Sequence, residues 1–362
     1  MPSETKDPPP LRCVQVGLGE WGENWCRVVL PYLRRRGIAE PVAIVDVDES
    51  RFSLAQETLG LPSSCCYTSL KRALADNDCD FVIVVVPPVA HEEVIGTALE
   101  QRRHVLCEKP LADSLPGCLR ISEQVSNAGV KMAVTMSHRF DQDKQSLQSA
   151  VESGKYGPLN YLVYRFTGNY RAFGSWGEFR HRIADPLLVE GSVHHFDIIR
   201  AIAASDAKTV YAKTWNPAWG EYAGDSTALI IIEMLNGVRC LYEGAKANAS
   251  TMNGWGQDYI RAECEYGTLE LNHRKLTVLK SGPGGKDLTR ERLGLRRDRP
   301  KWLNSAIAED FCDWLRGGPP PPTNYVDNLQ CCALLFGAIE AAHTGRCIDV
   351  QAFLAEAAMS PT

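Results

Sequence analysis

The feature that most constrains the fold of this chain is a glycine turn near its beginning. An apolar stretch, Cys13–Val16, is followed by Gly17-Leu18-Gly19-Glu20-Trp21-Gly22, and a helical pattern then runs from Glu20 to about Arg35. In such a strand–turn–helix unit, the first glycine permits the tight turn and the second lets the backbone approach a phosphate. The third lets the helix pack closely against the strand. The pattern is therefore typical of a turn that holds the pyrophosphate of a dinucleotide at the start of a helix.

A second apolar stretch supports this interpretation. Pro41–Val45 reads as the next strand, and Asp46 follows it where such units place a carboxylate that binds both hydroxyls of the adenosine ribose. The carboxylate favours NAD over NADP, because its charge would repel a 2′-phosphate and no arginine follows it directly, although Arg51 lies further on. For the glycine motif alone, an ordinary strand–turn–helix without a ligand remains the alternative.

Length, composition and charge limit the classes of protein to consider. The chain has 362 residues, which favours two domains, and its hydrophobic share of 44% and charged share of 23% are typical of globular proteins. A net charge of −5 and only short arginine-rich patches argue against a nucleic-acid-binding face. No apolar stretch is long enough to span a membrane, so we expect no membrane partner.

The first residues and the cysteines bear on the compartment. Residues 1–10 are polar and rich in proline, without the apolar core of a signal peptide, and we expect them to form a disordered tail. The 13 cysteines are odd in number and include no Cys-x-x-Cys pair. We therefore expect no disulfide framework, no metal site and a reducing, cytoplasmic location.

The first third of the chain alternates strands and helices. After the first two strands, the runs Cys65–Tyr67, Phe81–Val86, His104–Cys107 and Lys131–Val134 read as further strands. Phe81–Val86 is apolar and β-branched on both faces, as expected of a central strand in a parallel sheet covered by helices on both sides. Six strands alternating with helices predict a doubly wound α/β sheet of the Rossmann type over residues 11–136.

Several polar positions lie where these strands end. Ligands of such sheets bind beyond the carboxyl ends of the strands, and Glu108-Lys109-Pro110 directly follows one of them. A lysine held near a nicotinamide ring can hydrogen-bond a substrate hydroxyl and favour its alkoxide. From its position alone, Lys109 is equally well a surface lysine beside a turn proline. The cofactor-binding residues that we expect at this edge are Gly17, Leu18, Gly19, Glu20, Trp21, Gly22, Asp46, Val86, Pro87, His91, Glu108 and Lys109.

The combination of motifs resembles a known family. The glycine turn, Pro87-x-x-x-His91, Glu108-Lys109-Pro110 and the later run Glu190-Gly191-Ser192-Val193-His194-His195-Phe196-Asp197 are similar in order and spacing to the glucose–fructose oxidoreductase, inositol dehydrogenase and rhizopine-catabolism (Gfo/Idh/MocA) family. The resemblance covers nearly the whole chain. Where the family usually has Asp-x-Gly-x-His-x-x-Asp, this chain has Glu190 and Ser192 for the first Asp and the Gly, and Pro88 replaces the Asn of a Pro-Asn-x-x-His element.

The resemblance implies a fold and an activity. Members have an N-terminal Rossmann domain and a C-terminal α/β domain on a large, open, mostly antiparallel sheet, whose far face is often a subunit interface. They commonly oxidise a secondary alcohol of a sugar or cyclitol with NAD or NADP, or run the reverse reduction. The resemblance thus implies that Lys109 is the active-site lysine, that residues 137–362 form the substrate-binding domain, and that the protein is a homodimer or homotetramer.

The second half of the chain reads as such an antiparallel sheet. Its strand-like segments are separated by turns such as Asn236-Gly237, and two helical segments, Lys301–Arg316 and Asn328–Gly345, follow them. The segments are Tyr161–Thr167, Thr209–Trp215, Thr227–Glu233, Val238–Ala245, Asp258–Glu265, Thr268–Leu271 and Leu276–Leu279.

A helical segment over residues 186–202 carries a candidate base. Glu190, His194 and Asp197 are spaced so that they share one helix face. A carboxylate near an imidazole fixes the imidazole tautomer and raises its basicity, as a general base near neutral pH requires. By pattern alone, a core histidine and half of a metal site remain open, whereas the resemblance favours His194 as the base.

Further residues near this segment are candidates for substrate binding. Aromatic faces stack on sugar rings, and arginine binds carboxylates or several hydroxyls, while core packing is the alternative role. The candidates are Arg139, Trp176, Arg182 and His195.

We therefore hypothesise an NAD-dependent oxidoreductase that transfers hydride between a secondary alcohol of a sugar, sugar derivative or cyclitol and the nicotinamide. In this hypothesis, His194 takes the hydroxyl proton, Lys109 binds the same oxygen, and Glu190 orients His194 or binds a neighbouring hydroxyl. Two alternatives stay open. One is a glycoside hydrolase that uses NAD for a transient oxidation, and the other is a non-catalytic, ligand-sensing protein on the same scaffold.

Overall fold

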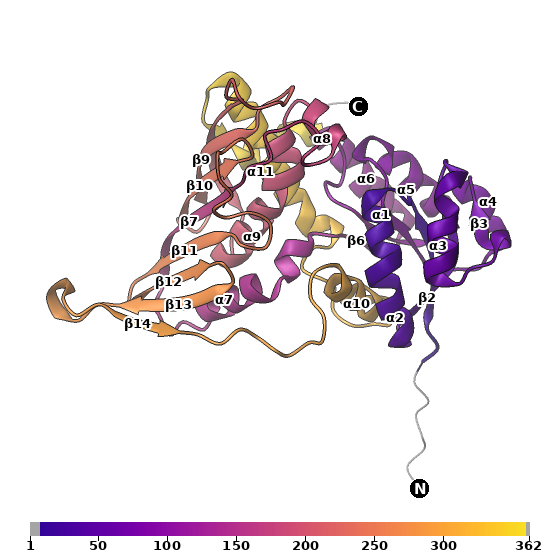
Figure 1. The fold of residues 1–362 in the computed structure, drawn as a ribbon, viewed down its shortest axis with the longest axis horizontal. Coiled ribbons are helices and arrows are strands. Elements are labelled where there is room, and N and C mark those ends of the chain that lie inside the picture. The colour runs from indigo at the N-terminus through magenta and orange to yellow at the C-terminus, as the bar shows by residue number, and fades with distance from the viewer. Residues whose placement is uncertain (1–7, 360–362) are drawn as a thin grey trace, which may run out of the picture. The chain divides into compact units, whose positions relative to one another are not determined.

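The structure, a computed structural model, describes residues 8–359, so residues 1–7 of the expected tail lie outside the described part. The chain divides into two compact units, each with its own sheet (Figure 1). The first comprises the described residues up to Met136 and Asn304–Asn328, and the second comprises Ser137–Leu303 and the chain from Leu329 onward. Asn304–Asn328 was predicted to belong to the second domain, residues 137–362, but the contacts of this segment group it with the first unit.

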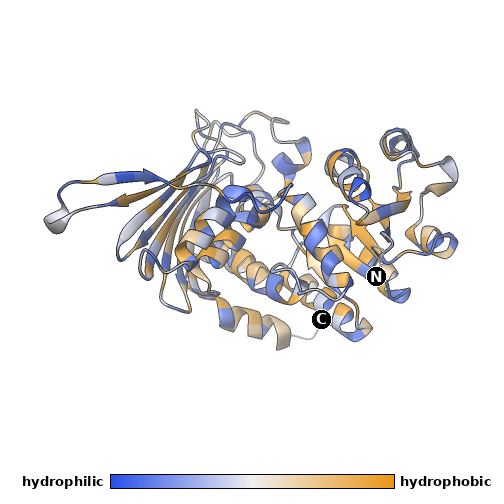
Figure 2. Ribbon diagram, turned by 90° about the horizontal axis from the view of Figure 1, so that it is seen from below, coloured by the Kyte–Doolittle hydropathy of each residue, from blue (hydrophilic) through white to orange (hydrophobic). Residues whose placement is uncertain are grey.

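The first unit contains a parallel sheet of six strands in the order β3-β2-β1-β4-β5-β6, which confirms the predicted doubly wound sheet. The strand order reverses between β1 and β4, and dinucleotides bind at such a switch point. Hydrophobic residues fill the strands of this sheet, as expected when helices cover both faces (Figure 2). The strands are β1 (Leu11–Val16), β2 (Ala39–Val45), β3 (Cys66–Tyr67), β4 (Phe81–Val84), β5 (His104–Cys107) and β6 (Met132–Val134).

Strand β4 is shorter than predicted, because it ends at Val84 and not at Val86. The amide of Val85 still donates to the carbonyl of Val16 at 2.8 Å, but Pro87 and Pro88 have no amide hydrogen and cannot extend the ladder. The chain therefore turns at the carboxyl edge of the sheet, beside the glycine turn that follows β1.

The predicted first helix contains a π-helical stretch. Helices α1 (Glu20–Asn24) and α2 (Leu30–Arg35) are joined by η1 (Trp25–Val29), where the amide of Leu30 donates to the carbonyl of Trp25. Pro31 has no amide hydrogen, so the regular ladder cannot continue through it, and the wider turn accommodates this break. The other helices of this unit are α3 (Phe52–Leu59), α4 (Leu70–Asp76), α5 (His91–Glu100), α6 (Leu115–Ala128) and α10 (Asn304–Leu315).

Helix α10 joins the core of the first unit from far along the chain. Phe311 meets Phe81 of β4 edge to face, with ring centroids 5.5 Å apart. The hydroxyl of Tyr32 on α2 donates to the carboxylate of Glu309 at 3.0 Å. These contacts explain why this segment groups with the parallel sheet.

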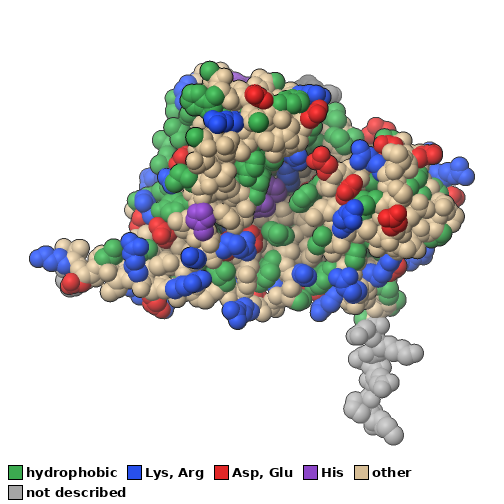
Figure 3. Space-filling model, in the orientation of Figure 1, with side chains coloured by type: hydrophobic (Ala, Val, Ile, Leu, Met, Phe, Trp, Pro, Cys, Tyr) green, Lys and Arg blue, Asp and Glu red, His purple; other side chains and the backbone are tan. Residues whose placement is uncertain are grey.

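The second unit contains a sheet of nine strands in the order β14-β13-β12-β11-β7-β10-β9-β8-β15. It is mostly antiparallel, as predicted, with a parallel pair between β7 and β10. The sequence did not predict β14 or β15; β14 extends β13 into a projecting arm that carries charged side chains of both signs (Figures 1 and 3). The strands are β7 (Leu159–Thr167), β8 (Ala207–Trp215), β9 (Thr227–Met234), β10 (Arg239–Ala245), β11 (Tyr259–Cys264), β12 (Gly267–Asn272), β13 (Lys275–Lys280), β14 (Thr289–Arg292) and β15 (Ile348–Asp349).

The two faces of this second sheet differ. Helices α7, α9 and α11 lie over one face (Figure 1). On strands away from the arm, the other face exposes large apolar side chains, and the pairing places Tyr211, Ile231 and Leu241 side by side on it. The helical segments that include this unit's residues are η5 (Ser137–Phe140), α7 (Gln142–Glu152), α8 (Glu178–Arg182), η6 (Leu188–Ser192), α9 (Val193–Ala203), α11 (Tyr325–Thr344) and α12 (Val350–Met359).

Among residues 8–359, none of the helices combines the length and the apolar character that crossing a membrane requires.

Candidate functional site

The glycine turn after β1 has the shape that a pyrophosphate needs. Gly17 has a φ of +93°, and a Cβ there would lie 2.0 Å from the carbonyl oxygen of Val85. A Cβ at Gly22 would lie 2.2 Å from the carbonyl oxygen of Gly17, so both positions require glycine. At Gly19, in contrast, the nearest neighbour of a Cβ would be Nη1 of Arg51 at 3.9 Å, which leaves open space above the backbone. The residues present therefore fit a dinucleotide whose phosphates approach Gly19.

Two buried or half-buried side chains hold this turn in place. The amide of Gln15 donates to the carbonyls of Gly17 and Gly22, both at 3.0 Å, a role that the sequence analysis did not predict. The carboxylate of Asp46, at the end of β2, accepts the backbone amides of Leu18 at 2.7 Å and Asp48 at 2.9 Å. Each carboxylate oxygen has more than one acceptor site, so Asp46 can hold the loop and still accept ribose hydroxyls.

A testable consequence concerns the choice of cofactor. Asp46→Asn keeps an acceptor for Leu18 but removes the charge that repels a 2′-phosphate, while Arg51 remains near Gly19. We expect the native protein to prefer NAD. In the variant, the kcat/KM with NAD divided by the kcat/KM with NADP should be lower than in the native protein by about tenfold or more. Glu40→Gln, on the same strand but paired with Arg34, is the control and should leave the ratio unchanged. A native preference for NADP would refute this role of Asp46.

His91 lies in the interior and not at the cofactor edge where we predicted it. Its side chain is fully buried, with Nδ1 3.1 Å from the carbonyl oxygen of Leu111 and Nε2 2.9 Å from that of Val86. Burial lowers the pKa of this imidazole. The ring therefore ties the loop after β4 to the chain that follows Pro110, and it acts on the cofactor edge only by holding the backbone of Val86.

Glu108 and Lys109 follow β5 directly, at the carboxyl edge of the parallel sheet. Glu108 is almost fully buried, and its carboxylate accepts the backbone amide of Lys109 at 3.3 Å. The peptide bond between Lys109 and Pro110 is cis. Lys109 thus lies where the sequence analysis expected it, on the edge that carries the glycine turn.

In the second unit, the predicted base His194 lies on α9 and is paired with a second imidazole. The rings of His194 and His138 stack, with centroids 4.4 Å apart and planes inclined by 18°. Trp255 meets both rings edge-on, at 6.3 Å from His194 and 5.2 Å from His138. His138 was not among the residues predicted from the sequence, although it directly precedes the candidate Arg139.

The carboxylates that we expected beside His194 have arginine partners. Glu190 accepts Nε of Arg180 at 3.0 Å, and Asp197 accepts Nη1 of Arg139 at 2.9 Å. Glu190 lies in η6, whose wider turn shifts its direction relative to α9, so the spacing of a regular α-helix does not apply between Glu190 and His194. Arg139, predicted to bind substrate, is thus engaged by the helix that carries His194.

The other predicted substrate residues take different positions. His195 is fully enclosed by Tyr164, Phe166 and Tyr242, and its Nδ1 lies 2.9 Å from the hydroxyl of Tyr242. It is therefore a core residue and not a substrate contact, and burial lowers the pKa of its imidazole well below the usual value. Arg182 is largely exposed and pairs with Glu178 at 2.9 Å.

Trp176 belongs to an aromatic cage around a buried lysine, which the sequence did not predict. The Nζ of Lys246 lies over the rings of four aromatic residues, between 3.5 and 4.9 Å from their centroids. Because Trp255 also contacts His194, the aromatic cage and the two stacked histidines form one continuous group of rings. The four rings are Phe166, Tyr170, Trp176 and Trp255.

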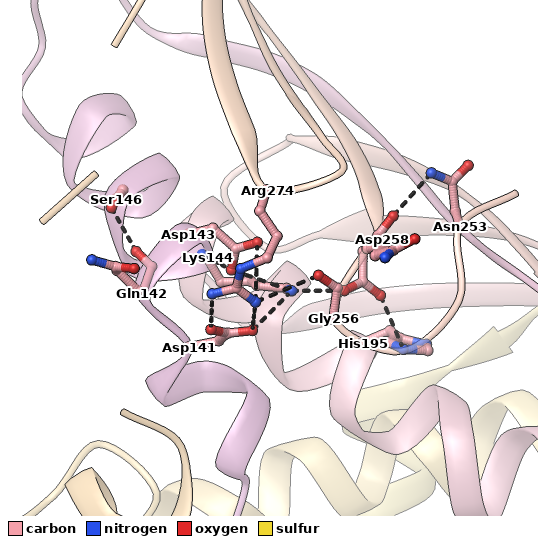
Figure 4. A network of polar contacts seen from close by, with 11 residues as sticks. Asp141, Gln142, Asp143, Lys144, Ser146, His195, Asn253, Gly256, Asp258 and Arg274 are labelled. Carbon is pink, nitrogen blue, oxygen red and sulfur yellow. Dashed lines mark hydrogen bonds and ion pairs between the residues drawn. The ribbon is translucent and has the colours of Figure 1, made fainter. Parts of the chain in front are cut away.

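The same unit contains a network of mostly buried charges (Figure 4). The ammonium of Lys144 lies 2.7 Å from Asp258, 3.2 Å from Asp141 and 3.3 Å from Asp143, and Arg274 binds Asp141 at 2.8 Å. Burial would raise the pKa of Asp141, but the hydrogen bond from Arg274 and the charge of Lys144 outweigh it and lower this pKa to about 2.

This network continues to the histidines, because His195 lies 3.7 Å from Asp258. The network therefore supports the helix that presents His194. Within the described residues, no cluster of three or more His, Cys, Asp or Glu side chains is arranged to hold a metal ion.

Comparisons with known proteins agree with the geometry. A family model described as "Oxidoreductase family, NAD-binding Rossmann fold" matches residues 11–136, and one described as "Oxidoreductase family, C-terminal alpha/beta domain" matches residues 148–350. An uncharacterized protein y4oX of Sinorhizobium fredii is 39% identical over 95% of this chain and 96% of its own length.

Two other similar proteins have more informative descriptions. A D-apiose dehydrogenase of Rhizobium rhizogenes is 26% identical over 86% of this chain and 90% of its own length. The crystal structure of an oxidoreductase from Agrobacterium radiobacter in complex with NAD+, L-tartaric acid and magnesium has the same fold, with a TM-score of 0.82 and 23% identity over 94% of this chain and 99% of that one.

Proposed function

The chain belongs to the Gfo/Idh/MocA oxidoreductase family, with its NAD-binding Rossmann domain, and on this premise we propose that it transfers hydride between a secondary alcohol and NAD. The alcohol belongs to a sugar, a sugar derivative or a cyclitol. The similarity of this chain to a D-apiose dehydrogenase and to an inositol 2-dehydrogenase supports this substrate class.

The proposal is supported by the groups that each unit, taken by itself, presents for alcohol dehydrogenation. The first unit has an open cradle at Gly19 and presents Lys109 from the same edge of the sheet. The second presents His194 in a wall of aromatic rings. A positioned amine and an imidazole are the groups that alkoxide formation needs, and aromatic faces suit the apolar face of a sugar ring.

The proposed mechanism assigns one task to each residue. His194 takes the proton of the reacting hydroxyl, and Lys109 donates a hydrogen bond to the same oxygen as negative charge develops on it. Bound NAD supplies the acceptor for the hydride that leaves the carbon. The paired Glu190 and Arg180 bind a neighbouring hydroxyl and hold the start of the helix that carries His194.

We also propose that the protein is a homodimer or homotetramer in a reducing cytoplasm. The exposed apolar face of the second sheet, around Tyr211, Ile231 and Leu241, supports self-association, and the absence of disulfides among the 13 cysteines supports the compartment. A monomeric mass by light scattering would contradict the assembly.

A screen of purified protein tests the activity. Sugars, sugar acids, cyclitols and aryl glycosides are incubated with NAD, and both NADH absorbance and nitrophenol release are recorded. We expect NADH from at least one free sugar or cyclitol. Nitrophenol release without NADH would instead identify a glycoside hydrolase that oxidises its substrate only transiently, and binding of a sugar without either signal would identify a sensing protein.

A further inference from the structure

Two tryptophans of the first helix share one carboxylate oxygen. The indole nitrogens of Trp21 and Trp25 donate to Oε1 of Glu108 at 2.7 Å and 2.9 Å. Trp25 is fully buried, whereas Trp21 is 47% exposed. We call these three residues the Trp–Glu clamp.

The sequence and the strand order explain how the clamp forms. Trp21 and Trp25 are four residues apart, so their side chains project from neighbouring turns of one helix face. Glu108 follows β5, while the helix follows β1, and β4 lies between these two strands. The carboxylate of Glu108 therefore reaches across the end of β4, beside the point where the strand order reverses and a dinucleotide binds.

The same carboxylate is tied to Lys109. While Oε1 accepts both indoles, Oε2 accepts the backbone amide of Lys109 at 3.3 Å, and the amide of Glu108 donates to the carbonyl of Val84 at 2.9 Å. Burial raises the pKa of Glu108, and the hydrogen bonds from Trp25 and Trp21 oppose that shift. One side chain thus joins the helix that begins at the glycine turn to the backbone that carries the lysine.

The exposure of Trp21 separates its role from that of Trp25. A buried tryptophan is explained by the apolar area that it removes from water, and Trp25 fits that explanation. Trp21 leaves about half of its surface in solvent, so the burial of apolar area does not explain its position as it does for Trp25. The contact that sets Trp21 apart is the hydrogen bond from its indole to Glu108.

We propose that Trp21 is a positioning residue, which acts through Glu108 to hold Lys109 in a fixed position relative to the glycine turn that would bind the pyrophosphate. Cofactor binding and the placement of Lys109 are then coupled through the indole N–H. This inference rests on the proposed function for the role of Lys109, but the coupling itself is a property of the first unit.

The first test separates turnover from cofactor binding. Trp21→Phe keeps an aromatic ring and removes the N–H, and because the side chain is half exposed, the variant should fold. We expect kcat to fall by about tenfold, the effect of losing a hydrogen bond to a charged group, with the dissociation constant of NAD changed by less than about threefold. Trp314→Phe, beside Lys131 at the amino-terminal edge of the sheet, is the matched control and should change neither value.

A second measurement does not depend on activity. The lysines are reductively methylated with carbon-13, and the signal of Lys109 is assigned by its loss in Lys109→Arg. We expect NAD to shift this signal in the native protein and in Trp314→Phe, but to shift it much less in Trp21→Phe and Glu108→Leu. Glu108→Gln keeps the acceptor oxygen and should retain most of the shift.

Two results would contradict the proposed role of the Trp–Glu clamp. One is a loss of NAD affinity in Trp21→Phe as large as the loss of kcat, because Trp21 would then simply contact the cofactor. The other is that Trp21→Phe has the same kcat as the native protein and that NAD shifts the signal of Lys109 equally in both. If the native protein oxidises no alcohol, the proposed function fails, and the signal of Lys109 still decides whether the clamp exists.

Discussion

Replacing Lys109 by methionine should lower kcat by about a hundredfold to a thousandfold while leaving the dissociation constant of NAD nearly unchanged. In the proposed mechanism, the ammonium acts on the oxygen of the substrate as this oxygen becomes an alkoxide, and that negative charge develops only along the reaction. Turnover is measured at saturating NAD, and NAD binding is measured by calorimetry. Lys71→Met, on the exposed side of α4, is the control for the loss of a lysine.

A double replacement tests whether Lys109 and His194 act on one oxygen. His194→Asn should reduce kcat by a similar factor, and the double variant should fall little further, because groups that act as a unit are strongly non-additive. If Lys109→Met retained full turnover, Lys109 would have no chemical role. If the two losses multiplied, the two groups would serve separate steps.

Replacing Lys144 by methionine should destabilise the protein by about 3–5 kcal/mol, because it leaves Asp141, Asp143 and Asp258 buried without their shared cation. The free energy of unfolding is measured with urea. Lys275→Met, on the exposed side of β13, is the control and should change this free energy by less than about 0.5 kcal/mol. A loss as small as that of the control would show that the ammonium does not hold the acids together.

The pH dependence gives this prediction a second readout. In the native protein the pKa of Asp141 is lowered to about 2, so its stabilising contribution is present above the unfolded pKa near 4 and is lost as the pH falls towards 2. Without Lys144 the three carboxylates lose the cation that they share and their pKa values rise, although Arg274 still binds Asp141. The difference in the free energy of unfolding between the native protein and Lys144→Met should therefore become smaller as the pH falls from 7 to 5. Adding Asp258→Asn to Lys144→Met should restore part of the stability.

The first unit could be predicted from the sequence because its signals are local. Runs such as Phe81–Val84 and Val105–Cys107 are β-branched or apolar throughout, and Gly17 and Gly22 sit where a Cβ would collide with a carbonyl. What the sequence could not show is the extent of each element. Two prolines end β4 before Val86, and Pro31 coincides with a π turn that a 3.6-residue period does not predict.

The candidate site was less predictable, because its contacts join residues far apart in the chain. Lys144 and Asp258, or His138 and His194, have no spacing that links them, and only the folded sheet brings them together. Helical spacing predicted that Glu190, His194 and Asp197 share one helix face, but Glu190 lies in a π-helical turn, to which the spacing of a regular α-helix does not apply. The spacing could not show that the two carboxylates accept hydrogen bonds from Arg180 and Arg139.

Histidines were the hardest residues to place. His91 and His195 follow motifs as clearly as His194 does, yet both are fully buried, whereas His194 keeps 6% of its surface exposed. Imidazole serves equally as a base, a ligand or a core hydrogen-bonding group, and the partners of its ring nitrogens decide which. For His91 these partners are backbone carbonyls, and for His195 one is the hydroxyl of a buried tyrosine.

The most direct test of the account is to follow the hydrogen itself. The best alcohol from the screen is prepared with deuterium on the carbon that bears the reacting hydroxyl, and the nicotinamide is analysed by mass spectrometry after turnover. We predict that each reduced cofactor carries one deuterium and that one ketone forms with it. Recovery of unlabelled, oxidised cofactor alongside a cleaved or unchanged substrate would contradict a net hydride transfer to NAD.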